Sequence, residues 1–269
     1  MNFKLDLEAD GMRIFRQGMQ VNRNIRALLW GAVLIASQGT SAGQNVYSDA
    51  TSQEVIQKKR NDYGTRLKAL EAYRQQQAQR YRNAQEGERG TIVIESRQRL
   101  TDALVQDVFP AWYGTDWAFH GTSTKPGEGK IACGYFVSTC LTHVGYQVDR
   151  IKLAQQPSQW IIETFMAPSE RNIMAGGKPM DTIRHYLRNK GNGIYIVGLD
   201  SHVGFVSVQG DDMAFIHSNY YEPDSFVKSE RIDSKNPLSD SKYRVFGKIF
   251  SDEMIGHWLT GHKYEVKTR

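Results

Sequence analysis

Residues 193–217 read GIYIVGLDSHVGFVSVQGDDMAFIH, and this stretch decides the fold class. Apolar and β-branched residues fill three short runs, at 193–198, 203–208 and 213–217, and Gln-Gly-Asp-Asp at 209–212 separates the last two. Short apolar runs bounded by glycine and aspartate indicate β-strands, and the four-residue break indicates a hairpin turn. We therefore predict a meander of three strands.

Two histidines, His202 and His217, lie at the start of the second run and at the end of the third. A two-residue turn at 209–210 would place them directly opposite each other. A four-residue turn at 209–212 would place His217 opposite Gly204, on the same face of the sheet as His202. A three-residue turn would place the two on opposite faces. In two of these registers the imidazoles are neighbours.

Upstream of the strands, apolar residues recur every three or four positions, which indicates helices. Helices are predicted at about 52–84, 95–109 and 133–145. Pro110 is expected to end the second helix, because proline lacks the N–H that a helix interior needs. Helices followed by a β-meander indicate an α+β fold. The remaining predicted elements are a loop at 111–130, a mixed and mostly helical segment at 150–190, a strand at 243–250 and a helix at 252–259.

The first 42 residues carry the features of a secretory signal peptide. An uncharged apolar run of ten residues at 27–36 has Arg23 and Arg26 in front of it and Thr-Ser-Ala behind it. A basic flank, a short apolar core and a small-residue exit are typical of such a leader, and a membrane span needs roughly 20 apolar residues. We predict that residues 1–42 direct export, with Met19 as an alternative start, and that the protein is periplasmic or secreted.

Behind the leader, residues 43–90 are predicted to be a polar linker and an amphipathic helix at about Ser52–Ala84. Residues 91–269 are predicted to be the main domain, with 150–190 as an insertion. The helix has one thin apolar stripe, so it either lies on the main domain with a solvated outer face or binds the cell wall or a protein partner. The formal charge of +5 suits contact with an anionic wall. No basic cluster is interleaved with aromatic residues, so nucleic acid is not expected as a partner.

Cys133 and Cys140 are the only cysteines. On one helix, a rise of about 1.5 Å per residue separates them by about 10 Å along the axis, whereas a disulfide needs Cα atoms within about 7 Å. Cys133 follows a glycine-containing loop and begins the predicted helix, where free N–H groups and the helix dipole favour a thiolate and lower the thiol pKa. We predict that Cys133 is a free nucleophile and that Cys140 packs in the core.

A thiol with two neighbouring imidazoles is the arrangement of thiol hydrolases, in which one imidazole takes the thiol proton and a second group orients it. Zinc is the competing chemistry, because Cys133, His202 and His217 are all zinc ligands. No close-spaced pair of the HxxxH or CxxC kind supports zinc. No metal or cofactor is therefore expected.

Four segments together resemble the signature of the NlpC/P60 family. They are TDWAFHGTS at 115–123, ACGYFV at 132–137, HVGFV at 202–206 and FIHS at 215–218, and the similarity covers about 95–220. The resemblance implies a papain-like fold, with the nucleophile helix packed on an antiparallel β-sheet and here an N-terminal helical extension. It also implies cleavage of peptide bonds in peptidoglycan stem peptides without a cofactor.

Residue by residue, the resemblance makes Cys133 the nucleophile, His202 the base and His217 the orienting third residue. Trp117 falls near the family's tyrosine, which helps to form the oxyanion site. The indole N–H of Trp117 is a donor, and so is the backbone N–H of Cys133. Packing is the alternative role for Trp117.

The sequence departs from the family at Ala132 and Gly134, where the family usually has aspartate and serine. Both family residues are tied to recognition of the free amine of the stem peptide, so the bond that is cleaved stays open. Two other functions also stay open. One is an amidase or acyltransferase that acts on a lipid or a small amide, and the other is a non-catalytic cell-wall-binding protein.

Overall fold

Within residues 52–268, which this computed structural model describes, six strands form one sheet in which every neighbouring pair is antiparallel. The predicted meander is its centre, and helices together with an antiparallel sheet confirm the α+β class. In sheet order, the strands are β2 (Arg171–Met174), β7 (Arg244–Lys248), β3 (Gly193–Leu199), β4 (Val203–Gln209), β5 (Asp212–Ser218) and β6 (Val227–Arg231).

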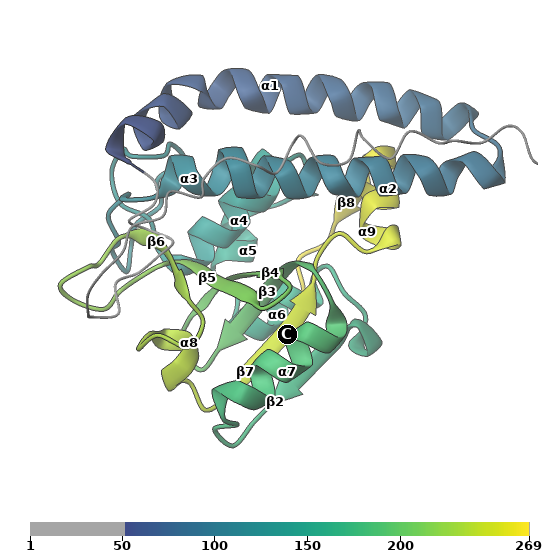
Figure 1. Cartoon of the computed structure of the whole chain (residues 1–269). Helices are drawn as coiled ribbons and strands as arrows, with labels where there is room; N and C mark the ends of the chain where they lie inside the picture. Colours follow the sequence, from purple (N-terminus) through teal and green to yellow (C-terminus); the bar gives the residue numbers. More distant parts are fainter. Residues whose placement is uncertain (1–51, 269) are drawn as a thin grey trace, which may run out of the picture. The chain divides into compact units, whose positions relative to one another are not determined.

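Both faces of the sheet are covered, which accounts for the unbroken apolar run of β3. Ile194 and Ile196 point into one hydrophobic cluster, and the alternate residues Tyr195 and Val197 point into another. Helix α4 (Cys133–His143) contributes to the first cluster and α7 (Met180–Lys190) to the second. Figure 1 shows both helices beside the sheet. The sheet is therefore the middle layer of three.

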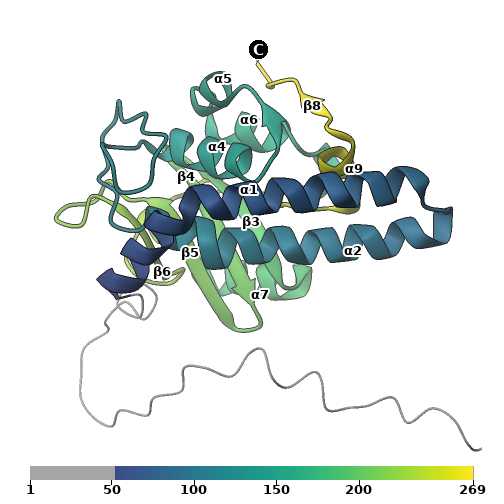
Figure 2. The same cartoon turned by 90° about the horizontal axis from the view of Figure 1, so that it is seen from above.

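The N-terminal helices form an antiparallel hairpin. Helices α1 (Gln53–Asn83) and α2 (Glu86–Asp102) lie side by side in both views (Figures 1 and 2), and α1 confirms the helix predicted at 52–84. Helix α2 continues through the π-helical segment η1 (Ala103–Val108) into α3 (Phe109–Trp112). The remaining elements are β1 (Gln147–Val148), α5 (Arg150–Ala154), α6 (Ser158–Glu163), the 3₁₀ turn η2 (Pro168–Glu170), α8 (Pro237–Asp240), α9 (Asp252–Thr260) and β8 (Lys263–Tyr264).

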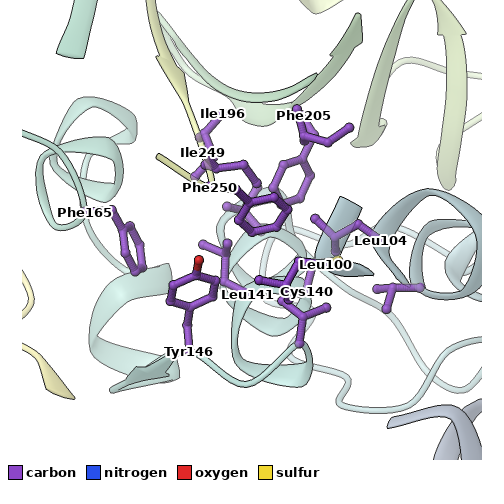
Figure 3. Close-up of a cluster of buried hydrophobic side chains, with 14 of the residues drawn as sticks. Leu100, Leu104, Cys140, Leu141, Tyr146, Phe165, Ile196, Phe205, Ile249 and Phe250 are labelled. Atoms are coloured by element: carbon purple, nitrogen blue, oxygen red, sulfur yellow. The ribbon is translucent and has the colours of Figure 1, made fainter. Parts of the chain in front are cut away.

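One hydrophobic cluster joins the helical hairpin, α4 and the sheet (Figure 3). Leu100 and Leu104 enter it from the helical hairpin, Cys140 from α4 and Phe205 from β4, and all four are fully buried. Interiors of this kind are close-packed and resist displacement of their parts. The cluster therefore fixes α4, and with it the position of its first residue.

The second helix differs from the prediction in two ways. It begins at Glu86 rather than near residue 95. Pro110 does not end it, because α3 contains this proline and continues to Trp112. The π-helical segment before α3 changes the hydrogen-bonding pattern, and a proline is tolerated in the first turn of a helical segment, where its missing N–H needs no partner.

The two edge strands, β2 and β6, were not anticipated by the sequence pattern. Strand β2 lies inside the 150–190 segment, which otherwise contains the expected helices α5, α6 and α7. Strand β6 reads Val-Lys-Ser-Glu-Arg, and its three central polar residues are buried. Because buried polar residues break the apolar alternation of a strand, periodicity alone does not reveal β6.

The predicted signal peptide at 1–42 and the linker that follows it to residue 51 lie outside the described residues. In the part of the chain that the structure describes, no helix combines the length and the apolar character that crossing a membrane requires.

Candidate active site

Helix α4 begins at Cys133 and so places this residue at its N-terminus, as predicted. The preceding residue, Ala132, provides no side-chain cap for the helix. Cys133 and Cys140 are both free thiols, which confirms that one helix keeps them unbridged. Cys140 is fully buried and Cys133 is half-buried. Of these two residues, only Cys133 is partly exposed.

Strands β4 and β5 bring the two histidines together. The hairpin turns at Gly210–Asp211, and its register puts His217 across from Gly204, one of the two registers expected to make the imidazoles neighbours. A Cβ added at Gly204 would lie 2.9 Å from Cβ of His217, so only glycine leaves room for the imidazole there. Nε2 of His202 and Nδ1 of His217 are 2.9 Å apart and share a hydrogen bond. The predicted pairing of the imidazoles is confirmed.

Two buried charged residues on β6, Glu230 and Lys228, continue the line of polar contacts that starts at His202 and His217; we call these four side chains the polar row. Oε1 of Glu230 lies 2.8 Å from Nε2 of His217, and Oε2 of Glu230 lies 3.3 Å from Nζ of Lys228. The β5–β6 register pairs His217 with Lys228 and Phe215 with Glu230. The side chains of His217, Phe215, Lys228 and Glu230 therefore lie on the same face of the sheet. Glu230 and Lys228 were not predicted as part of the site. The sequence does contain one indication of them: Lys228 and Glu230 carry opposite charges and are two positions apart, so their side chains lie on the same face if the segment is a strand.

The thiol and this row of polar side chains meet at the start of β4. Helix α4 packs on the face of the sheet that Phe205 lines, whereas the ring of His217 stacks on Phe215 of the opposite face at a centroid distance of 4.0 Å. The backbone N–H of Val203, directly after His202, interacts with the thiol of Cys133. The thiol and the imidazoles therefore reach the start of β4 from opposite faces of the sheet, and the backbone of Val203 is the observed link between them.

The thiolate predicted for the resting protein is wrong. Burial raises the pKa of the Cys133 thiol, and the backbone N–H groups of Val203, Gly134 and Cys133 only partly counter this effect. Burial also holds the pKa of His202 and that of His217 well below the usual range, with repulsion from His217 and from Lys228, respectively, as the second cause. Desolvation disfavours the charged forms, so thiol and imidazoles are neutral near pH 7.

One nitrogen of the histidine pair is left over. Nδ1 of His202 is buried and has no hydrogen-bond partner within residues 52–268. Buried polar atoms are almost always paired, and an exception in a native structure calls for an explanation. Since Nε2 of His202 is occupied by His217, Nδ1 is the atom that remains to receive a proton.

Trp117 lies near the histidines through an intervening ring. Its ring is 5.9 Å from that of Tyr220, which in turn is 5.1 Å from the ring of His202, both as centroid distances. The backbone N–H of Trp117 donates to the carbonyl of Ser225 and holds the loop against the segment before β6. Trp117 and Tyr220 thus form an aromatic wall next to His202. Tyr220 was not predicted as part of the site.

The loop before Cys133 carries an open surface hollow of about 670 Å³. The backbone N–H of Ala132 donates to the carbonyl of Gly121 in its lining, at 2.9 Å, which ties the hollow to the residue before Cys133. Its charged and titratable lining residues are His120, Lys125, Glu128 and Lys130. Lys125 and Glu128 form an ion pair at 3.4 Å, so Lys130 is the unpaired charge of this lining within the described residues.

The structure thus pairs the imidazoles of His202 and His217 and places the thiol of Cys133 beside the backbone N–H of Val203, the residue after His202. Trp117 lies next to Tyr220 at the border of the histidine pair. Comparison of the chain with models of protein families, with curated proteins and with solved structures found no match.

Proposed function

We propose that this protein is a cysteine hydrolase that cleaves amide bonds. The observation that carries the proposal is that Cys133 begins α4 with its thiol beside the backbone N–H of Val203, and that the residue before Val203, His202, forms a hydrogen-bonded pair with His217. A thiol, an imidazole base and a group that orients the base are the parts that covalent acyl transfer needs. Here they are Cys133, His202 and His217.

In the proposed reaction, the sulfur of Cys133 bonds to the carbonyl carbon while the thiol proton moves to Nδ1 of His202. The C–N bond then breaks, the proton passes from His202 to the leaving amine, and a thioester remains. Water attacks the thioester, gives a proton to His202 and releases the carboxylic acid, and the thiol regains its proton. Since the resting thiol is neutral, proton transfer accompanies the attack, and hydrogen bonds of this kind often tighten only when substrate binds.

We further propose that the fold is papain-like, of the NlpC/P60 type, and that the substrate is the stem peptide of peptidoglycan. Support comes from the resemblance of 115–137 and 202–218 to that family, from the leader predicted at 1–42 and from the net charge of +5. A helix that begins with the nucleophile and packs on an antiparallel sheet agrees with this assignment. The proposed location of the protein is periplasmic or extracellular, and the proposed reaction requires no cofactor.

The test is digestion of isolated cell wall by the chain without its predicted leader, followed by mass spectrometry of the products. We expect wild-type protein to release peptide fragments, and Cys133→Ser and His202→Ala to release none while each keeps its fold. His185→Ala is the matched control, because His185 is exposed on α7, a helix that packs on the second cluster. Each variant is checked by circular dichroism.

Full digestion by Cys133→Ser or by His202→Ala would reject the assigned roles. If wild-type protein leaves the wall intact but Cys133 becomes acylated by a small amide or a lipid ester, an amidase or acyltransferase replaces the peptidase. If Cys133 is never acylated and the protein co-sediments with wall, the protein is a binding protein.

A further inference from the structure

The hydrogen bonds that run from His202 through His217 end in a buried ion pair of Glu230 and Lys228. In this pair the carboxylate can only accept hydrogen bonds and the ammonium can only donate them. Glu230 is 2% exposed, and its two oxygens face different partners, Oε1 toward His217 and Oε2 toward Lys228. Asp224 lies 3.9 Å from Nζ of Lys228, and the ring of Tyr220 packs on that of His202.

These roles determine where the histidine protons lie. Because Oε1 of Glu230 accepts, Nε2 of His217 must carry a proton. A neutral imidazole has one N–H, so Nδ1 of His217 is an acceptor. The partner of that acceptor, at 2.9 Å, is Nε2 of His202, which must therefore donate. Nδ1 of His202 is left with a lone pair and no proton.

We propose that Glu230 is a positioning residue that fixes the proton positions of both histidines and so keeps the Nδ1 lone pair of His202 ready for the thiol of Cys133. The proton positions are a property of the fold alone, and only the part played by Cys133 rests on the proposed function. Burial and the nearby ammonium of Lys228 keep the pKa of His217 low, which supports neutral imidazoles in the row.

The direct test is nitrogen-15 NMR of the histidine rings at pH 7, with His202→Asn and His217→Asn used to assign the signals. We expect the proton on Nε2 in both His202 and His217. A proton on Nδ1 of His202, or a doubly protonated His217, would overturn the proposal. This measurement needs no substrate and no variant of Glu230.

Glu230→Gln should move the proton of each histidine from Nε2 to Nδ1. The ammonium of Lys228 has only protons to offer, so it takes the carbonyl oxygen of the new amide and turns the amide NH₂ toward Nε2 of His217. His217 must then carry its proton on Nδ1, and His202 must carry its proton on Nδ1 as well. A base in the wrong tautomer cannot accept a proton. We expect NMR to show both inversions and hydrolysis to slow by on the order of 100-fold.

A second substitution should restore the order. In Lys228→Met/Glu230→Gln no ammonium holds the carbonyl oxygen of the amide, so the amide can also turn this oxygen to His217. A share of the protons then returns to Nε2 and about tenfold of the rate is regained, a coupling typical of adjacent residues. Unchanged tautomers in Glu230→Gln, or a double variant that stays inverted, would refute the proposal. If the tautomers behave as expected but wall is not cleaved by wild-type protein, the proposed function fails and the positioning role stands.

Discussion

Gly134 follows Cys133, the proposed nucleophile, in the first turn of α4, at the position where the NlpC/P60 pattern has serine. A Cβ added there would lie 2.2 Å from the carbonyl oxygen of Ala154, the last residue of α5. The segment inserted between Cys133 and His202 therefore occupies the space in which a serine side chain would stand. The departure from serine is a consequence of how α5 packs on α4, and it removes a polar group from the neighbourhood of the thiol.

This contact predicts opposite effects for two glycine substitutions. Gly134→Ala forces α5 away from α4, and we expect the free energy of unfolding to fall by about 1–3 kcal/mol, as for other overpacked sites. Gly64→Ala is the matched control, because a Cβ at this exposed position of α1 meets no described atom within 4 Å. It should raise the free energy of unfolding by about 0.5–1 kcal/mol. Urea denaturation measures both, and equal shifts would contradict the packing argument.

Polar contacts join helix α1 to α3 and to the end of α4. The hydroxyl of Tyr63 accepts a hydrogen bond from Nε1 of the fully buried Trp112 at 3.0 Å and is 2.9 Å from Nδ1 of His143, the last residue of α4. Nε of Arg60 donates to the carbonyl of Ala111 at 3.0 Å. The outer face of α1 is solvated, and its use as a partner surface remains a prediction.

Tyr63→Phe tests this junction. The substitution leaves the buried indole N–H of Trp112 without an acceptor, and an unsatisfied buried donor costs about 1–3 kcal/mol. We expect a loss of unfolding free energy in that range and faster amide hydrogen exchange in α1. Tyr81→Phe is the control, because the Tyr81 hydroxyl forms no hydrogen bond with described residues. If the two variants lose equal stability, the hydrogen bonds of Tyr63 do not anchor α1.

The elements that sequence reasoning predicted are those whose burial is regular. Strands β3, β4 and β5 alternate between two apolar clusters, and α1 repeats a buried residue every seven positions at Ile56, Tyr63, Leu70 and Gln77. Strand β6 has no such regular apolar pattern, because its buried residues Lys228 and Glu230 are charged and are held inside by their contacts with each other and with His217. Their burial depends on His217 of a neighbouring strand, and no local pattern encodes it.

The site shows the same division between local and long-range information. The position of Cys133 at a helix start follows from the local pattern, and the hairpin limited His202 and His217 to a few registers. The direction of the pKa shift of the Cys133 thiol could not be predicted from the local sequence pattern. The helix N-terminus acts locally and lowers the pKa, but burial by distant segments raises it by more.

At the scale of the whole molecule, three histidines are held neutral inside the protein. Burial lowers the pKa of His202 and of His217 well below the usual range, and it lowers the pKa of His143 to about 4 with help from Arg150. The unfolded chain binds protons at these positions near pH 6.5, whereas the folded chain does not. Acid therefore favours the unfolded chain.

The sign and the window of this effect follow from proton linkage. Stability rises with pH wherever the unfolded state binds more protons. The unfolding free energy should therefore be at its maximum above about pH 6.5 and fall below it, by up to about 1.4 kcal/mol per pH unit for each histidine. For His143 the fall ends near pH 4, where the folded protein also binds the proton. Urea denaturation at intervals between pH 7 and pH 4.5 measures the slope.

His143→Asn isolates one of the three contributions. The amide can still accept the hydrogen bond from the Tyr63 hydroxyl, so the junction with α1 is kept while the titrating group is lost. Its slope below pH 6 should be smaller than that of wild-type protein by about 1.4 kcal/mol per pH unit. Carboxylates such as Glu163 and Asp200, whose pKa values are lowered by their hydrogen bonds, destabilise the fold mainly at lower pH and do so equally in both proteins. Parallel slopes for the variant and wild-type protein would mean that His143 is already charged in the folded state.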